Sequence, residues 1–428
     1  MTINGKFKQI RKKKNLTQKE LAKMINCDRS YIARMESGSR DIPPQIISAF
    51  KIALEIECAP LTNEDIEEYI ANLCTLNELV SLGQLDKAKK LHQNLELGIE
   101  WVFEQDIVTL YELFTAEFYR VSGDMKAYEK TIIALEKKQH EFNYEHKYWY
   151  WCQKGSCELV SGYSKNALLS FLHAENIGDR LGLAYETICI SIARCLTDIA
   201  YVLLSIEYLE KAQKIAKERV NNKYNVCIQS LLASNYSILG WHVKAIKLIE
   251  SCISDEKEKV GAKESIGALY HLMCNVYQRK GDFDKAFECT EAALTYFNKN
   301  SDYYIYNIYL KASILLSHNK TNEGEKYLAK GLNISIKGSL LNTLIVALKS
   351  SATLNNLSSR RHLETISIPQ LLNFGQVVVV LDCYIMLRQY YYNAEEYKNA
   401  LKYSQMENEI TKRFVERELL EQFLDTYK

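Results

Sequence analysis

One short pattern returns along most of the chain: a turn residue, usually glycine, followed five positions later by a small residue, usually alanine. Its clearest copies are residues 281–286 and 83–88, and each leads into an apolar helical pattern. The turn positions are 83, 123, 162, 207, 240, 281, 319 and 395. They lie 33 to 45 residues apart, except for a final gap of 76, which is twice 38 and predicts a degenerate copy near Leu357. This spacing predicts about nine helical hairpins, none of which can bury its apolar face alone.

Residues that break helices are scarce. The 428-residue chain has 4 prolines and 17 glycines, about 1 % and 4 % where average usage is about 5 % and 7 %. Helix interiors exclude proline because it lacks the backbone N–H, and glycine because of its backbone entropy. The sequence therefore predicts an all-α fold. A β-branched run at 377–380 fits a helix poorly, and we expect it to be a buried helix because of its place in the repeat.

The charge of the chain is unevenly distributed. Its net charge is +1, from 54 Lys+Arg and 53 Asp+Glu. Residues 1–57 hold 12 basic and 6 acidic groups, or +6, which leaves 42 minus 47, or −5, for the remaining residues. A compact basic segment is the electrostatic signature of a nucleic-acid-binding module.

Helix signals divide this basic segment into four short helices. Residues 17–20 read as a capping box, in which the Thr17 hydroxyl and the Glu20 carboxylate each accept from the other residue's backbone N–H. Asp28 is a suitable N-cap for a third helix that ends at Gly38, and a proline pair at 43–44 opens a fourth.

This segment resembles the lambda-repressor-like helix-turn-helix family of bacterial and phage regulators. The resemblance rests on Thr17-Gln18, Leu21-Ala22, Ile32, Glu36 and Gly38 and covers about residues 5–56, with Cys27 as a mild departure in the turn. It implies that the third helix enters the major groove of DNA with its N-terminal residues at base edges. The implied DNA-binding residues are Gln18, Arg29, Ser30, Tyr31, Arg34 and Arg40, with Gln18 and Arg40 on phosphates. An alternative for Arg34 is an ion pair with a helix acid. The resemblance also implies a structural role for Glu36, which in this family ties the helix end to neighbouring basic groups.

The repeat unit resembles the tetratricopeptide repeat, most clearly at residues 268–294. The resemblance implies a right-handed superhelix whose concave wall is lined by the first helix of each hairpin, at positions thirteen, ten, six and three before the turn. The residues this register places on the wall, or one position from it, are Arg194, Thr197, Tyr201, Ser230, Ser234, Asn235, His271, Asn275, Gln278, Arg279 and Tyr309. Amide side chains can bind the N–H and C=O of an extended peptide, tyrosine offers stacking area, and Arg194 or Arg279 could hold a carboxylate. At each position the alternative is a solvated polar residue on an exposed helix.

A basic helix-turn-helix head joined to such repeats resembles the peptide-pheromone receptor regulators of the Rap, Rgg, NprR, PlcR and PrgX group. The resemblance implies a homodimer that binds a palindromic DNA operator and is controlled by a short signalling peptide in the concave groove. Two other functions stay open: repeats that serve only oligomerisation or protein binding, and a Rap-like action on response regulators. The expected domains are 1–57 (helix-turn-helix), 58–65 (linker), 66–404 (repeats) and 405–428 (a C-terminal capping helix).

Signals for catalysis and export are absent from the sequence. The glycines never form GxG, and neither HExxH nor GxSxG occurs, so we expect no enzyme activity, cofactor or metal. None of the 12 cysteines forms a CxxC pair, and most lie in apolar helical patterns, which favours buried free thiols. With no signal-peptide core and no unbroken apolar stretch of about 18 to 20 residues, the chain is expected to be cytoplasmic and not to bind membranes.

Overall fold

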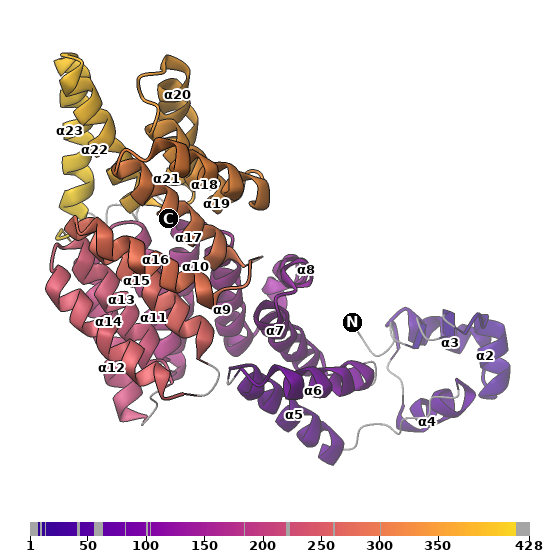
Figure 1. Ribbon diagram of the computed structural model, residues 1–428. Coiled ribbons are helices and arrows are strands. Elements are labelled where there is room, and N and C mark those ends of the chain that lie inside the picture. Colours follow the sequence, from indigo (N-terminus) through magenta and orange to yellow (C-terminus); the bar gives the residue numbers. More distant parts are fainter. Residues whose placement is uncertain are drawn as a thin grey trace. The chain divides into compact units, whose positions relative to one another are not determined.

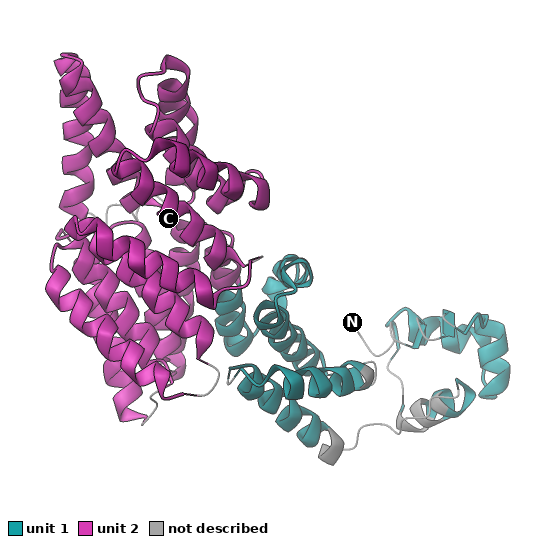
Figure 2. Ribbon diagram, viewed as in Figure 1, with its two compact units in different colours: residues 1–153 teal, residues 154–428 magenta. Residues whose placement is uncertain are grey.

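A computed structural model describes residues 7–8, 11–12, 14–40, 43–54, 63–81, 83–99, 102, 104–183, 185–219, 223–259, 262–299 and 301–416. Over these residues the chain is helical and contains no β-strand (Figure 1). The all-α fold expected from the scarcity of proline and glycine is confirmed. The chain forms two compact units, residues 1–153 and residues 154–428 (Figure 2). This division differs from the predicted boundaries at 57/58 and 65/66, which stay predictions.

The first unit begins with three short helices that enclose a small apolar core. They are α2 (Gln18–Met24), α3 (Arg29–Glu36) and α4 (Pro44–Ala53). Phe7 and Phe50 meet in this core with ring centroids 4.6 Å apart, against fully buried Leu21 and Ile32. Ala22 is also buried here, and its small side chain allows α2 and α3 to pack closely. Apolar residues of α2, α3 and α4 therefore share one core.

Helical hairpins follow. In the first unit they are formed by α5 (Asn63–Ser81), α6 (Leu85–Gly98), α7 (Gln105–Ser122) and α8 (Met125–Glu136), before the short η2 (Gln139–Glu141) and α9 (Tyr144–Val160), which crosses into the second unit. The second unit continues with α10 (Ser164–Leu181), α11 (Glu186–Asp198), α12 (Val202–Glu218), α13 (Asn225–Ile238), α14 (His242–Lys257), α15 (Lys263–Lys280), α16 (Phe283–Tyr296), α17 (Asp302–Ser317) and α18 (Thr321–Ile334). It ends with α19 (Leu340–Ser351), α20 (Leu357–His362), the π-helical η3 (Leu363–Ser367), α21 (Ile368–Asn373), α22 (Val377–Asn393) and α23 (Tyr397–Arg413).

Paired in order, with α20, η3 and α21 as one continuous second helix, the described helices from α5 onward make nine hairpins. The number predicted from the repeat spacing is confirmed, and the degenerate copy expected near Leu357 is the turn that ends where α20 begins. The β-branched run at 377–380 is the first turn of α22, with Val377 and Val380 fully buried. The predicted start of a capping helix at residue 405 falls inside α23, so residues 405–413 complete the ninth hairpin. Residues 417–428 of that prediction lie outside the described part of the chain.

Eight of the nine turns between the described paired helices use a left-handed residue, and the turn between α19 and α20 does not. Gly281, with φ +82°, ends α15, and a residue of positive φ stands at each of the other predicted turn positions except 207. The prediction at 207 is wrong, because Glu207 lies inside α12 and the turn is made by Ala200 with φ +72°. With Ala200 as the turn, the gaps from 162 and to 240 become 38 and 40 residues instead of 45 and 33. Regular spacing was the sequence signal that could have located this turn.

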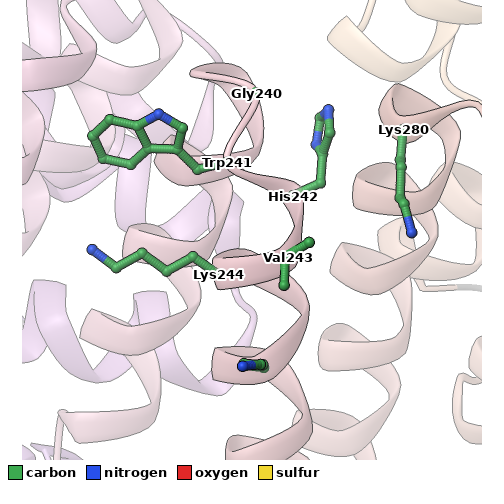
Figure 3. A pocket seen from close by; sticks show the side chains of 7 residues that line it. Gly240, Trp241, His242, Val243, Lys244 and Lys280 are labelled. Carbon is green, nitrogen blue, oxygen red and sulfur yellow. The ribbon is translucent and has the colours of Figure 1, made fainter.

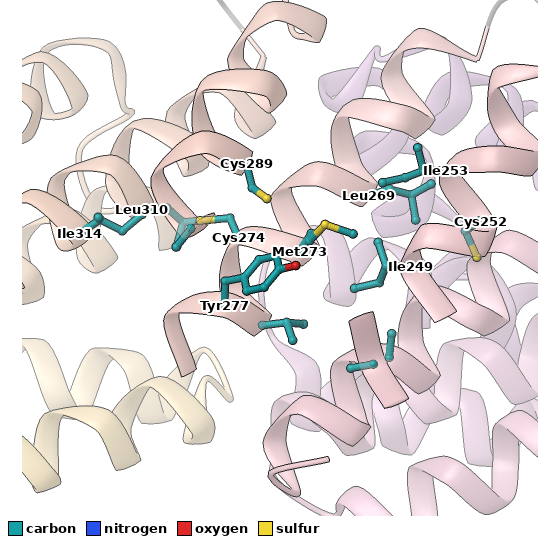
Figure 4. Packing of buried hydrophobic residues seen from close by; sticks show 14 residues of the cluster. Ile249, Cys252, Ile253, Leu269, Met273, Cys274, Tyr277, Cys289, Leu310 and Ile314 are labelled. Atoms are coloured by element: carbon teal, nitrogen blue, oxygen red, sulfur yellow. The ribbon is translucent and has the colours of Figure 1, made fainter. Parts of the chain in front are cut away.

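Stacking of the hairpins gives the second unit its core. The cluster in Figure 4 joins α13 to α17 and includes Ile249, Leu269, Cys274 and Leu310, all nearly inaccessible to solvent. Each buried Leu or Ile contributes about 1.5 to 3 kcal/mol from removal of apolar surface from water. Gly267 allows α15 to pack closely against the end of α16, since a Cβ on Gly267 would lie only 2.8 Å from the side chains of Tyr296 and Phe297. Adjacent hairpins are thus held by continuous apolar packing, as repeat architectures require.

Within the second unit the last hairpins also contact the first ones. A Cβ on Gly375 would lie 3.0 Å from Ser164, and the Tyr163 and Phe374 rings lie 5.7 Å apart. Leu203 N donates to Phe414 O at 3.1 Å. These contacts bring inner helices that are far apart in sequence, such as α15 and α22, to a common wall.

Candidate DNA- and peptide-binding sites

The DNA-binding candidate is α3, and a capping box and a buried ion pair fix its position. The predicted capping box is present: Glu20 N donates to Thr17 Oγ1 at 3.2 Å, and Thr17 N donates to Glu20 Oε2 at 2.7 Å. Asp28 stands at the N-cap of α3 as predicted, but its side chain makes no cap hydrogen bond. The N-terminal N–H groups of α3 are therefore not capped by the Asp28 side chain.

Glu36 has the structural role predicted for it. Its carboxylate accepts from Arg11 Nε at 2.6 Å, from Arg11 Nη2 at 2.8 Å and from Gln18 Nε2 at 2.9 Å, and the side chain is only 2 % exposed. Burial raises the pKa of Glu36, but the bonds from Arg11 and Gln18 outweigh it, so the pKa lies below its usual value. This network joins the N-terminal segment, α2 and α3.

The predicted base-reading residues lie on the exposed first turns of α3. Arg29 is the first residue of the helix and is exposed, with no ion-pair or hydrogen-bond partner in the described part of the chain. Ser30 is exposed too, and its carbonyl accepts from Arg34 Nε at 3.3 Å. Arg34 has no acidic partner among the described residues, so the alternative of a pair with a helix acid finds no support. The guanidinium of Arg40 lies 4.4 Å from the ring centre of half-buried Tyr31.

Gln18 has a bond inside the protein beside its predicted contact. The resemblance gives it a phosphate contact, which stays a prediction, and its amide nitrogen donates to Glu36. One of its two amide hydrogens is thereby used inside the protein. The described structure therefore places Gln18 in the network that holds α3 as well as at the N-terminus of α2.

The peptide-binding candidate is the inner wall of the second unit. With the turn corrected to Ala200, the inner positions of α11 become Thr187, Ile190, Arg194 and Thr197. Arg194 keeps an inner position and is exposed. Tyr201 does not: it is the N-cap of α12 and only 3 % exposed, which corrects the prediction that it lines the wall.

Thr197 and Asn235 are corrected as well, because they belong to a buried polar network. Thr197 Oγ1 lies 2.9 Å from both Ser205 Oγ and Asn235 Oδ1, and Asn235 Nδ2 donates to Ser205 Oγ at 2.8 Å. Ser205 Oγ also donates to the carbonyl of Ala193 at 2.7 Å. Asn235 is fully buried and Thr197 is 8 % exposed. Their polar atoms bind one another between α11, α12 and α13 and do not face a groove.

The predicted wall residues of α13, α15 and α17 remain reachable by solvent. Half-buried members are Ser230, Ser234, His271, Asn275, Gln278 and Tyr309, and Arg279 is exposed. Ser230 Oγ donates to the carbonyl of Val226 at 2.7 Å, a bond within its own helix. Arg279 forms an ion pair with Asp382 of α22, with Nη2 3.6 Å from Oδ2.

Four charged groups act on the hydroxyl of Tyr306 on this wall. Burial, Asp198 and Asp382 together raise the pKa of Tyr306 to about 12, while Arg279 and Arg194 oppose them. Three of these four groups bind a side chain of the protein: Arg279 pairs with Asp382, and Asp198 accepts a hydrogen bond from Ser164 Oγ at 2.6 Å. Arg194 forms no ion pair or hydrogen bond with the described residues, although its charge lowers the pKa of Asp198. Of the two arginines predicted to hold a carboxylate, Arg194 is therefore the one available for it.

The sequence reasoning missed Asp198, Ser313 and Asp382. The register that it used contains two of them, since Asp382 lies thirteen residues before the turn at Glu395 and Ser313 lies six before Asn319. Asp198 follows the inner position of Thr197 by one residue, as Asn235 and Arg279 follow Ser234 and Gln278, so it was within reach of the same register. Applying the register to every turn would have found Ser313 and Asp382.

A family model of helix-turn-helix proteins matches residues 7–59. Residues 7–59 form a helix-turn-helix domain. Its α2 and α3 are the two helices of the motif, and Arg29, Ser30, Tyr31 and Arg34 stand on α3. A search of curated proteins found no match to the chain.

Several solved structures match about four fifths of the chain, which is far more than the helix-turn-helix domain. A Rap protein complexed with competence and sporulation factor has a TM-score of 0.69 and 16 % identity, over 81 % of this chain and 98 % of that one. NprR in complex with its cognate peptide NprX has a TM-score of 0.69 and 17 % identity, over 80 % and 99 %. The apo form of the quorum sensor NprR from B. thuringiensis has a TM-score of 0.60 and 18 % identity, over 80 % and 99 %. The helix-turn-helix domain is thus followed by repeats with the tetratricopeptide-like fold of Rap and NprR.

A pocket of about 520 Å³ lies elsewhere, at the turn between α13 and α14 (Figure 3). It is lined by Gly240, Trp241, His242, Val243, Lys244, Lys247 and Lys280, none of which is a predicted site residue. An extended peptide that crosses several helices needs an open wall, whereas this concavity spans two turns only. It does not coincide with either candidate site.

Among the described residues, no helix combines the length and apolarity that a membrane span requires. No group of three or more His, Cys, Asp or Glu side chains in the described part of the chain is arranged to hold a metal ion. The described cysteines are free thiols, and burial raises the pKa of Cys189 and Cys252 to about 11.

Proposed function

We propose that this protein is a DNA-binding transcription regulator whose state is set by a short peptide on the concave wall of its repeats. The observation that carries the proposal is the combination of a helix-turn-helix domain with a repeat fold shared with NprR, which has been solved with its cognate peptide. The proposal includes no catalytic step, no cofactor and a location in the cytoplasm. It also includes a homodimer on a palindromic operator.

The DNA-binding step is supported by the state of α3. Its position is fixed by the Arg11–Glu36 pair, while Arg29 at its first position is exposed and unoccupied. A guanidinium can bond guanine O6 and N7 together, which discriminates against other bases by about 1 to 3 kcal/mol. Preorganised scaffolding with a free reading side chain is the arrangement that sequence-specific binding requires.

Selection from random-sequence duplex DNA tests this step, because it identifies the operator sequence and measures binding to it in the same experiment. We expect enrichment of a site with two inverted half-sites, because a two-fold dimer reads a palindrome. Arg29→Ala should weaken binding to that site by about 1 to 3 kcal/mol, or roughly 5- to 150-fold. Arg361→Ala, an exposed arginine of α20, is the matched control. Equal affinity of Arg29→Ala and wild type would reject Arg29 as a reading residue.

The peptide step is supported by the inner wall of the second unit. Polar side chains from α13 and α15 are reachable by solvent there, and Arg194 is exposed without an acidic partner in the described chain. Affinity selection of a random hexapeptide library, read by mass spectrometry, tests whether the wall binds peptides. A second library with amidated C-termini tests Arg194: we expect fewer or weaker binders, and Arg194→Gln should remove the difference between the two libraries.

Coupling between the two steps is tested with the best peptide selected. If peptide binding shifts the population of repeat conformations, operator affinity and the small-angle scattering profile should both change. No change in either quantity at saturating peptide would reject peptide control of DNA binding.

A protein ligand is the second candidate for the wall. The Rap structure matches the chain with the same TM-score as the NprR complex, so the fold alone does not favour one over the other. An absence of peptide binders combined with operator binding that is unaffected by wall variants would favour repeats that serve only oligomerisation or a protein partner.

A further inference from the structure

Two amide side chains on the inner face of α15 already use N–H groups inside the protein. Asn275 Nδ2 lies 3.3 Å from His271 Nε2 and 3.3 Å from the backbone oxygen of His271. Gln278 Nε2, three residues later, donates to Ser313 Oγ of α17 at 2.8 Å. Asn275 Oδ1 and Gln278 Oε1 have no donor among the described residues. Both amides therefore present a free carbonyl oxygen.

His271 decides which way the Asn275 amide faces. An amide nitrogen can only donate, so His271 Nε2 must accept and the imidazole proton must be on Nδ1. Burial lowers the pKa of His271 to about 4, against a smaller opposing effect of Asn307, so the ring is neutral at pH 7. The Tyr306 ring fixes its orientation by an edge contact, with centroids 5.0 Å apart and an interplanar angle of 84°.

The buried surroundings of His271 agree with that tautomer. His271 Nδ1 and the Oδ1 of Asn307 on α17 are both buried and neither has another hydrogen-bond partner, while a hydrogen bond between the two side chains raises the pKa of His271. A proton on Nδ1 supplies a donor where the neighbouring unsatisfied group is an acceptor. A proton on Nε2 would instead oppose the N–H groups of Asn275.

The spacing of the two free carbonyls suits an extended peptide. Residues three apart on a helix are neighbours, with Cβ atoms about 5 to 6 Å apart. Along one edge of an extended strand, N–H groups recur every second residue, about 6.6 to 6.8 Å apart. Two flexible amides with that separation can receive both N–H groups.

We propose that His271 is a positioning residue that holds Asn275 as a hydrogen-bond acceptor, and that Asn275 and Gln278 receive the backbone N–H groups of peptide residues i and i+2. This rests on the proposed peptide-binding function and deepens it. It narrows, for Asn275, the expectation that wall amides serve the N–H and C=O groups of a peptide alike, because both Asn275 amide hydrogens are used inside the protein, whereas Gln278 keeps one. A ligand of this wall carries no proline at either position, because proline has no backbone N–H.

The tautomer is tested in the full-length free protein. Long-range ¹H–¹⁵N spectra of histidine-labelled protein distinguish a protonated Nδ1 from a protonated Nε2, and His271→Gln assigns the signal. We expect His271 to be neutral with its proton on Nδ1 at pH 7. A proton on Nε2 would overturn the positioning role whatever the chain binds.

The acceptor role is tested with the tightest hexapeptide from the library and its single N-methyl analogues. We expect roughly tenfold weaker binding for methylation at two positions separated by one residue, since each removes a donor to a desolvated acceptor. Asn275→Asp keeps an acceptor, and the imidazole can then donate to it, so binding should stay within about threefold. Asn275→Leu should weaken binding of the hexapeptide roughly tenfold. Asn322→Leu, an exposed position of α18, is the matched control.

The outcomes separate the two proposals. If no library member binds, the proposed function fails and this inference fails with it. If a peptide binds but Asn275→Asp loses as much affinity as Asn275→Leu, or if no pair of N-methyl positions is sensitive, only the positioning proposal is overturned. Thermal unfolding of each variant shows whether a loss of binding reflects a loss of folding.

Discussion

Two parts of the same inner wall use similar polar residues in opposite ways. Between α11 and α13, Thr197 and Asn235 are buried and bind each other and Ser205. On α15, Asn275 and Gln278 are half-buried and leave carbonyl oxygens free. Ser205 stands five residues after its turn, where the hairpin of α15 has Ala286. A hydroxyl at that position gives the neighbouring polar groups a buried partner, whereas a methyl group offers none.

The largest test of this contrast is the removal of Asn235. Asn235→Ala leaves Thr197 and Ser205 without their amide partner and opens a cavity, so we expect a loss of about 3 kcal/mol in the free energy of unfolding. Urea denaturation measures it. Asn275→Ala is the control, and should cost less than about 0.5 kcal/mol because that side chain is partly solvated. Similar losses in the two variants would contradict the contrast.

Acid should destabilise the α15 part of the wall through His271. The pKa of His271 is about 4 in the folded protein and about 6.5 when unfolded. The unfolded chain therefore binds more protons between pH 6.5 and 4, so stability falls as pH drops through that window and is insensitive to this group above it. We expect about 2 kcal/mol of loss between pH 6.5 and 4.5. The measurement is urea denaturation at each pH, and in His271→Gln this part of the pH dependence should disappear.

Apolar replacement of the whole buried network sharpens the same contrast. The triple variant Thr197→Val, Ser205→Ala, Asn235→Leu removes every polar member together, so no group is left unsatisfied. Its free energy of unfolding should lie within about 1 kcal/mol of wild type. A loss as large as that of Asn235→Ala alone would show that shape, and not hydrogen bonding, holds these helices together.

The smallest effect is expected for the Arg279–Asp382 pair. Both side chains are partly exposed, at 32 % and 45 %, and burial raises the pKa of Asp382 despite the opposing charge of Arg279. A double-mutant cycle with Arg279→Ala and Asp382→Ala should give a coupling energy of about 0.5 kcal/mol or less. A coupling above about 2 kcal/mol would show that the pair holds α15 and α22 together.

Local signals in the sequence were enough to predict the hairpin count, most turns and the two helices of the helix-turn-helix motif. Gly281 and Gly123 could be placed because a left-handed turn favours glycine, and Thr17 and Glu20 because a capping box is local. These features depend on interactions between residues near one another in the chain. The turn at Ala200 escaped because alanine carries no such signal, and the prediction at 207 displaced the register of α11.

Packing between the hairpins determines which polar residues are free to contact a ligand. Asn235 and Asn275 are both amides near the inner positions of their helices. Asn235 is buried and hydrogen-bonded to Ser205, whereas the amide of Asn275 is oriented by His271. Arg279 and Arg194 are both basic wall residues, yet only Arg279 meets Asp382, about a hundred positions away in sequence. Helix periodicity fixes the direction of a side chain, but its partner comes from another helix, and the stacking of hairpins chooses that partner.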